Sequence, residues 1–129
     1  MFRIGNTVGF FQVRPVAGAP QLKLRTVTED PRILFEVVSR VRKMFDLDSD
    51  PMLIAQCFAQ LPLLAQLCDR FPGLRLPRGW DGFETAVCSI LGQLVSAEQR
   101  SNLIAQLVCH YGDEIMHPLT GEKTRLFPE

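Results

Sequence analysis

Two helix-start signals on either side of one short turn constrain the fold of this chain more than any other feature. The patterns Asp81-x-x-Glu84 and Ser96-x-x-Gln99 are both typical of a reciprocal cap at a helix N-terminus. The first predicts a helix from Gly82 to about Gln93, and the second predicts a helix from Ala97 to about Tyr111. The segment Gln93-Leu94-Val95 is therefore expected to form a tight turn with an apolar side chain at its tip.

The chain before these two helices mixes strands with shorter helices. The sequence predicts strands over Val8–Arg14 and Gln21–Val27, joined by a turn rich in Pro and Gly, and apolar and polar residues alternate in the second strand. A single hairpin is only marginally stable in water, so it needs partner strands or a helix over its apolar face. Periodicity and capping residues predict three more helices, over 31 to about 45, 52 to about 59 and 62 to about 71. We expect loops at 72–80 and 113–129. The fold class is therefore α+β, with an N-terminal β-hairpin followed by a mainly α-helical bundle.

Composition identifies an ordinary globular chain. Of its 129 residues, 47% are hydrophobic and 22% are charged, which argues against disorder. No apolar run approaches the roughly 20 residues that a membrane span needs. The N-terminal segment Met1-Phe2-Arg3-Ile4-Gly5-Asn6 is too short and too polar to be a signal peptide. A cytoplasmic location is therefore expected.

The charges are unevenly distributed although the net charge is zero. Residues 1–45 contain eight Lys or Arg against three acids, whereas residues 46–129 contain six against eleven. A basic segment is able to contact phosphate groups, but a solvated strand and helix face explains the same pattern. Charge alone does not select between the two.

No metal site, cofactor site or catalytic pair is predicted. The four cysteines (Cys57, Cys68, Cys88 and Cys109) form no C-x-x-C pair and lie in apolar helical patterns, as reduced core thiols do. The aspartates at 46, 48 and 50 lack the glycine and the bidentate acid of a calcium loop.

The turn at Gln93-Leu94-Val95 has two structural interpretations. It joins the helices of a simple helical hairpin, with Leu94 and Val95 packing the elbow, or those of a helix-turn-helix that enters a major groove. Gln99, Arg100 and Asn102, at the start of the second helix, suit base contacts. Glu98 and the acidity of this half of the chain weigh against them.

A family resemblance adds to this interpretation. Three blocks carry it, in order: Phe45-Asp46-Leu47, Pro72-Gly73-Leu74-Arg75-Leu76-Pro77, and the long block from Asp81 to Ser96 that ends in Ile90-Leu91-Gly92-Gln93-Leu94-Val95-Ser96. They resemble the bacterial 3-methyladenine DNA glycosylase II family, of the helix-hairpin-helix glycosylase superfamily. The resemblance covers about residues 8–129, in the N-terminal and central portion of the family pattern.

The resemblance implies a function, a partner and a site. Enzymes of this family flip an alkylated base, such as 3-methyladenine, out of duplex DNA and hydrolyse its N-glycosidic bond without a metal or cofactor. Leu94 corresponds to the wedge that fills the vacated space, with Gln93 beside it. Val95, Ser96 and Arg100 are expected to support the turn or to contact the DNA backbone. The partner is double-stranded DNA with alkylated bases.

The resemblance also implies an incomplete pair of domains. Residues 1–30 correspond to the C-terminal hairpin of a small α/β domain, and residues 31–129 to the first half of an all-α glycosylase domain. The family's catalytic aspartate and helix-hairpin-helix follow the portion matched here, so no residue of this chain is assigned as catalytic. The alternative is a non-enzymatic helical module that binds DNA, or that self-associates as a homo-oligomer through exposed apolar surface.

Overall fold

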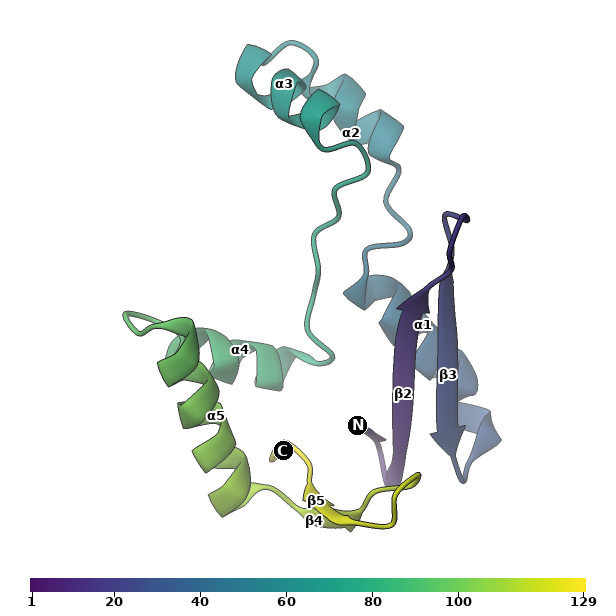
Figure 1. Cartoon of the computed structure of the whole chain (residues 1–129), viewed down its shortest axis with the longest axis vertical. Coiled ribbons are helices and arrows are strands. Elements are labelled where there is room, and N and C mark those ends of the chain that lie inside the picture. Colours follow the sequence, from purple (N-terminus) through teal and green to yellow (C-terminus); the bar gives the residue numbers. More distant parts are fainter.

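The computed structural model describes residues 1–129 and contains an N-terminal sheet, five α-helices and a C-terminal hairpin (Figure 1). The elements are β1 (Phe2–Ile4), β2 (Thr7–Pro15), β3 (Leu22–Thr28), η1 (Pro31–Ile33), α1 (Leu34–Met44), α2 (Pro51–Phe58), α3 (Pro62–Arg70), α4 (Gly82–Leu91), α5 (Ala97–Tyr111), β4 (Glu114–Met116) and β5 (Lys123–Arg125). The predicted α+β class, with strands first and helices after, is confirmed. None of the helices is long and apolar enough to cross a membrane.

The N-terminal sheet is antiparallel, with strand order β1-β2-β3. The two predicted strands are present as β2 and β3, and β1 supplies the partner strand that the hairpin needs. Phe2 of β1 lies opposite Gly9 of β2. A Cβ at Gly9 would clash with the Phe2 ring and lie 2.8 Å from the Val27 carbonyl oxygen, so only glycine lets that ring cover the strand.

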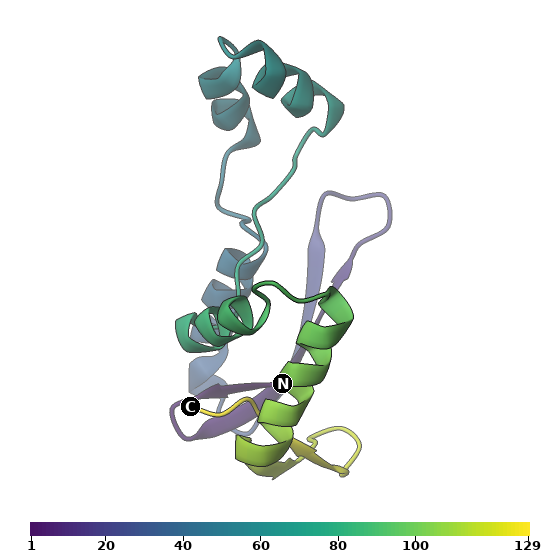
Figure 2. The same cartoon turned by 90° about the vertical axis from the view of Figure 1, so that its left-hand side faces the viewer.

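Helix α1 packs on one face of this sheet and closes the core of the molecule. Asp30 caps the 3-10 turn η1 that leads into α1, because its carboxylate accepts a hydrogen bond from the Arg32 amide at 3.0 Å. The α-helix itself begins at Leu34, after Ile33, which forms no side-chain cap bond, and so three residues later than the sequence predicts. Val37 and Val41 of α1 are buried together with Phe2, which is only 1% exposed. Figure 2 shows α1 and the sheet as two adjacent layers.

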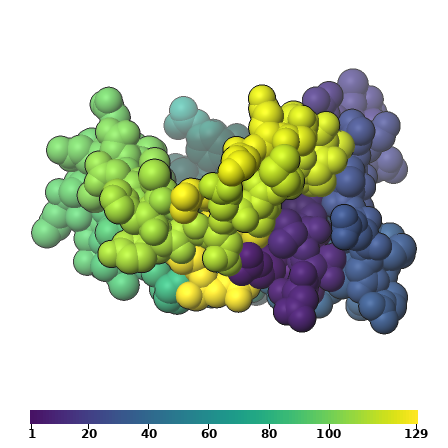
Figure 3. Space-filling view, turned by 90° about the horizontal axis from the view of Figure 1, so that it is seen from below, coloured from purple at the N-terminus to yellow at the C-terminus, as the bar shows by residue number.

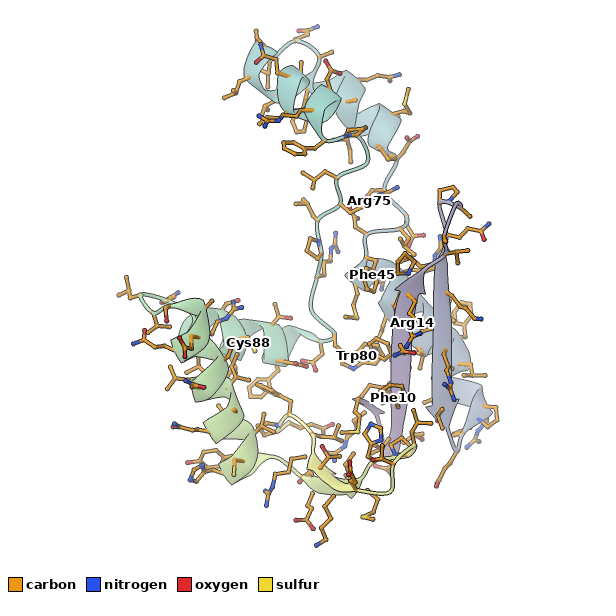
Figure 4. The ribbon with its side chains drawn as sticks, in the orientation of Figure 1. Phe10, Arg14, Phe45, Arg75, Trp80 and Cys88 are labelled. Carbon is orange, nitrogen blue, oxygen red and sulfur yellow. The ribbon has the colours of Figure 1, made fainter.

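Trp80 connects this core to the segment that follows. Its ring lies 5.2 Å from the ring of Phe2 and stacks at 5.0 Å on Phe11 of β2. The guanidinium of Arg40 on α1 lies 5.2 Å from the same ring, at cation–π distance. The residue directly before the cap of α4 is therefore held by the sheet and by α1 together (Figure 4).

Helices α2 and α3 form an arm that projects from the rest of the chain on two extended connections (Figure 1). Arg75, in the second connection, donates from its guanidinium to the carbonyl oxygens of Asp46 (2.8 Å) and Ser49 in the first. The Arg78 amide donates to the Met44 carbonyl at 3.0 Å. These bonds hold the two connections side by side at the base of the arm.

The C-terminal residues differ from expectation. The segment 113–129, for which the sequence predicts a loop, contains the short hairpin β4–β5, in which Glu114 lies opposite Arg125. His117 in this hairpin lies 5.3 Å, ring to ring, from Phe10 of β2. Figure 3 shows the yellow C-terminal residues between green α5 and the purple N-terminal strands. The prediction fails because three-residue strands carry too little alternation to be recognised.

Much apolar surface of the helices is uncovered. The accessible surface is 9808 Å², whereas a compact monomer of this mass exposes about 6,900 Å². The four helices after α1 lie in two separate pairs, α2–α3 and α4–α5, and the apolar positions expected to face a core are largely open. Those that expose a third or more of their surface include Leu53, Leu61, Leu63, Phe83, Ile90, Leu103 and Tyr111.

The predicted division between residues 1–30 and 31–129 stays a prediction. Val37 and Val41 of α1 share the core with Phe2, so helix and sheet are packed together across that position.

Replacing Trp80 tests whether the aromatic stack holds the fold together. Trp80→Ala is expected to lower the free energy of unfolding by about 3 kcal/mol, because it removes a large side chain from Phe2 and Phe11. Urea unfolding followed by far-UV circular dichroism measures the change. Trp80→Phe should recover most of it, and Tyr111→Ala, at an exposed aromatic, should cost little. Equal losses for Trp80→Ala and Tyr111→Ala would contradict the role given to Trp80.

A pH dependence is expected at the base of the arm. The pKa of Asp46 is lowered from 3.8, chiefly because the Ser49 hydroxyl donates to its carboxylate. A lowered pKa in the folded state contributes stability that is present above pH 3.8 and lost as the pH falls through the lowered value. Asp46→Asn should therefore melt below wild type at pH 6, and the difference should shrink on acidification below about pH 4.

Thermal melts followed by circular dichroism across this pH range measure the effect. The matched control is Asp69→Asn, because the exposed Asp69 carboxylate has no hydrogen-bond partner, and this variant should melt like wild type. A constant difference for Asp46→Asn from pH 6 to below about pH 4 would refute the assignment.

Candidate functional site

The candidate site is the turn between α4 and α5. Asp81 caps α4 by accepting a hydrogen bond from the Glu84 amide at 2.8 Å. The Glu84 side chain forms no return bond to the Asp81 amide, so only one half of the predicted reciprocal cap is present here. The helix ends at Gly92, whose amide donates to the Cys88 carbonyl at 3.1 Å. Three residues, Gln93-Leu94-Val95, then connect it to the next cap. The turn predicted from the two capping patterns is therefore present at the predicted position.

Leu94 has an unusual backbone and a fully exposed side chain. Its φ is +60°, in the left-handed region that leucine rarely adopts. Its relative accessibility is 105%, the highest value among the exposed large hydrophobic residues. In this structure Leu94 does not pack the elbow of a helical hairpin; it projects from the tip, while Val95 beside it is 37% exposed.

The start of α5 fixes the second side of the turn. The Ser96 hydroxyl accepts from the Gln99 amide at 3.2 Å, and the Gln99 side chain accepts from the Ser96 amide at 3.0 Å. Both halves of the capping box predicted from sequence are thus formed. Because each donor is satisfied locally, the turn keeps its shape without support from another element.

Arg100 of α5 packs back onto the end of α4. A Cβ at Gly92 would lie 2.7 Å from Cδ of Arg100 and 3.1 Å from the Cys88 carbonyl oxygen. The glycine therefore makes room for the methylene stem of Arg100, and the guanidinium forms no ion pair. The sequence places Arg100 in turn support or backbone contact, but it does not predict the packing on Gly92.

Two titratable groups on α4 have raised pKa values. Partial burial, and then the nearby Asp81 carboxylate, raise the pKa of Glu84. Burial and Glu84 raise the pKa of the Cys88 thiol. A raised thiol pKa leaves little thiolate at neutral pH, so Cys88 is unsuited to act as a nucleophile.

The structure brings the five predicted site residues together at one end of the α4–α5 pair. Gln93, Leu94 and Val95 form the exposed tip, Ser96 caps α5, and Arg100 lies against Gly92. Their roles toward DNA stay predictions. What sequence reasoning missed is the left-handed backbone of Leu94, for which the only sequence signal is the short connection between two caps.

Comparison with known proteins gives a family match. Residues 1–81 match the family model described as "AlkA N-terminal domain". The match contains the sheet, α1 and the α2–α3 arm, and it ends at the cap of α4.

Two curated relatives are similar over most of the chain. The chain is 36% identical over 102 residues to the "Probable bifunctional transcriptional activator/DNA repair enzyme AlkA" of Mycobacterium tuberculosis (strain CDC 1551 / Oshkosh), covering 79% of this chain and 20% of that protein. It is 34% identical over 80 residues to "DNA-3-methyladenine glycosylase 2" of Escherichia coli (strain K12), covering 62% and 26%. The chain thus spans about a fifth to a quarter of the length of these relatives.

A solved structure has a similar fold. The structure described as "Structure of MBOgg1 in complex with low affinity DNA ligand" superimposes with a TM-score of 0.64 at 22% identity, covering 91% of this chain and 37% of that chain. At this identity the likeness concerns the fold.

The left-handed backbone of Leu94 allows a test of whether the stability of the turn depends on leucine at this position. Leu94→Asn should raise the free energy of unfolding by about 0.5 to 1 kcal/mol, because asparagine tolerates the left-handed region and the leucine side chain packs against nothing. Chemical denaturation measures the change. The matched control is Leu53→Asn, since Leu53 is also exposed (61%) but lies in regular helix, where asparagine is the poorer residue. A loss of stability in Leu94→Asn would show that the turn depends on the leucine itself.

Proposed function

The chain belongs to the AlkA N-terminal domain family, as its match over residues 1–81 shows, and from that premise we propose that it carries the DNA-opening turn of a base-excision-repair glycosylase. The family expected from the sequence is thereby confirmed, and the chain is related to DNA repair glycosylases. The observation that most supports the proposal is Leu94: a leucine held in left-handed backbone with its whole side chain in solvent. The contact with duplex DNA is our proposal.

The proposed action of Leu94 is to fill the space that a flipped base leaves in the stack. Unstacking a base costs a few kcal/mol, and an inserted apolar side chain offsets part of that cost. Full burial of a leucine side chain yields roughly 1.5 to 3 kcal/mol. A side chain that packs against nothing in the free protein has this whole gain available on binding.

The neighbours of Leu94 suit the same task. Gln93 is exposed beside the tip and has no hydrogen-bond partner for its side-chain amide, so it is free to bond an unpaired base. Ser96 and Gln99 fix the turn through the capping box. Arg100 has an unpaired guanidinium next to the turn, where it is placed to contact a phosphate.

The substrate and the reaction are proposed from the family. Alkylated bases such as 3-methyladenine are the proposed lesions, and hydrolysis of the N-glycosidic bond is the proposed reaction, with no cofactor. None of the residues described here is assigned to stabilise the cationic transition state. We propose that this chain opens the duplex and that groups outside it complete the chemistry.

A second candidate is a non-enzymatic module that self-associates. The observation in its favour is the open apolar surface of α2–α5, since the accessible surface exceeds that of a compact monomer by about 2,900 Å². A pair of copies that covered these faces would bury more than a standard protein interface does.

Binding to a duplex with one abasic position tests the wedge. Leu94→Ala should weaken this binding roughly 10- to 100-fold, the factor that corresponds to the burial a leucine side chain would otherwise gain. It should weaken binding to the intact duplex much less, because the stack there has no gap. Fluorescence anisotropy with labelled duplexes measures both affinities.

The control is Leu53→Ala, which removes an exposed leucine from the arm and should change neither affinity. Equal effects of Leu94→Ala and Leu53→Ala on the affinity for the abasic duplex would refute the proposal that Leu94 fills the gap in the stack. An affinity indifferent to Leu94, together with a molecular mass that rises with protein concentration, would favour the self-associating module. Release of 3-methyladenine from alkylated DNA by the chain alone would contradict the placement of the chemistry outside it.

A further inference from the structure

The outer face of the N-terminal sheet carries a row of cations that neither the core nor the turn at Leu94 uses. Phe11 and Val13 of β2 pack toward α1. Because side chains alternate along a strand, Gln12 and Arg14 lie on the opposite face. Their partners across the ladder are Arg25 and Lys23. Arg14, Lys23 and Arg25 are called the basic face below.

The basic face has no compensating acid. Residues 1–28 contain four Lys or Arg and no Asp or Glu. Arg3 forms an ion pair with Asp113, whereas the three cations of the basic face are exposed and form none. Phe10, on the same face, is covered by His117 of the C-terminal hairpin. The end of the sheet that carries Arg14 extends beyond this hairpin (Figures 1 and 4).

The arrangement is unfavourable for the isolated fold. Arg14 lies directly opposite Lys23 in the antiparallel ladder, and like charges at such a position repel. Cations on an edge strand protect a sheet against edge-to-edge association, which accounts for Lys23 and Arg25 on β3. The same protection applies to Arg14, because β1 pairs only with Thr7–Gly9 and the far end of β2 has a partner on one side alone. The repulsion between Arg14 and Lys23, which lie directly opposite each other on one face, would be relieved by a bound polyanion.

We propose that the basic face binds the phosphodiester backbone of duplex DNA, as a second contact surface besides the turn at Leu94. Lys23 and Arg25 lie two residues apart on one strand, which places their positions about 6.8 Å apart. That spacing is comparable to the distance between successive phosphates of one nucleic-acid strand. The choice of DNA as the polyanion rests on the proposed function. The row of cations itself is observed in the structure and does not depend on that function.

The test compares two triple variants that remove the same charge. One is Arg14→Gln, Lys23→Gln and Arg25→Gln; the other is Lys43→Gln, Arg70→Gln and Arg78→Gln, at exposed cations elsewhere. Affinity for a short intact duplex is measured by anisotropy over a range of salt concentrations. The slope of log K against log salt should fall by about 2.7 in the first variant, which is about 0.9 for each phosphate that is no longer neutralised. The second variant should keep the slope of wild type.

Three outcomes would overturn the proposal. An unchanged slope in the first variant would show that these cations do not contact the backbone. An equal fall in both would show that net charge alone matters. Stronger binding of wild type to phosphatidylserine vesicles than to the duplex, abolished in the first variant, would assign the face to an anionic membrane. The first variant should melt at or above wild type, because it removes the repelling pair, so a defect in binding is separable from a defect in folding.

This result is separable from the test of Leu94. The intact duplex has no gap, so Leu94→Ala should leave its salt slope unchanged. If Leu94→Ala leaves the affinity for the abasic duplex unchanged while the first triple variant lowers the salt slope, the role proposed for Leu94 is refuted and the basic face is supported. If Leu94→Ala weakens that affinity while the triple variant leaves the slope unchanged, the role of Leu94 is supported and the basic face is refuted.

Discussion

The contact of Trp80 with the sheet and α1 is the constraint on which the arrangement of this molecule depends. The core is small, and its buried side chains come mainly from β1 and α1. Trp80 stacks on Phe2 and Phe11 and lies under Arg40, directly before the cap of α4. Because a stacked indole is held in both position and orientation, the direction in which α4 leaves the core is fixed at this point.

The α4–α5 turn shows how local chemistry positions a side chain for use. Two caps and Gly92 define a connection so short that one of its residues takes left-handed backbone. A glycine or asparagine there would cost less. Leucine at that position is unfavourable for the free protein, and we propose that insertion into an opened DNA stack offsets this cost.

Two surfaces of opposite character remain open on the same chain. The helices expose apolar side chains over α2–α5, and the outer face of the sheet exposes cations without partners. The apolar faces suit close packing against protein, because burial there releases water from hydrocarbon. The cations suit a polyanion, because they keep their charge in water and exchange counterions for phosphate. The matched portion is a fifth to a quarter of each relative, so ample protein exists in them to cover the helices.

Local signals in the sequence determined the elements and the turn. Capping boxes, prolines at first helical positions and strand alternation predict α1 to α5, β2, β3 and the apolar tip at Leu94, because each depends on residues a few positions apart. Short strands such as β1 and β4–β5 were missed, since three residues carry no period. Only the tertiary structure decided that Trp80 packs on the sheet and α1 directly before α4, and that Arg75 bonds the two connections at the base of the arm. These depend on contacts between residues distant in sequence, and no local pattern encodes them.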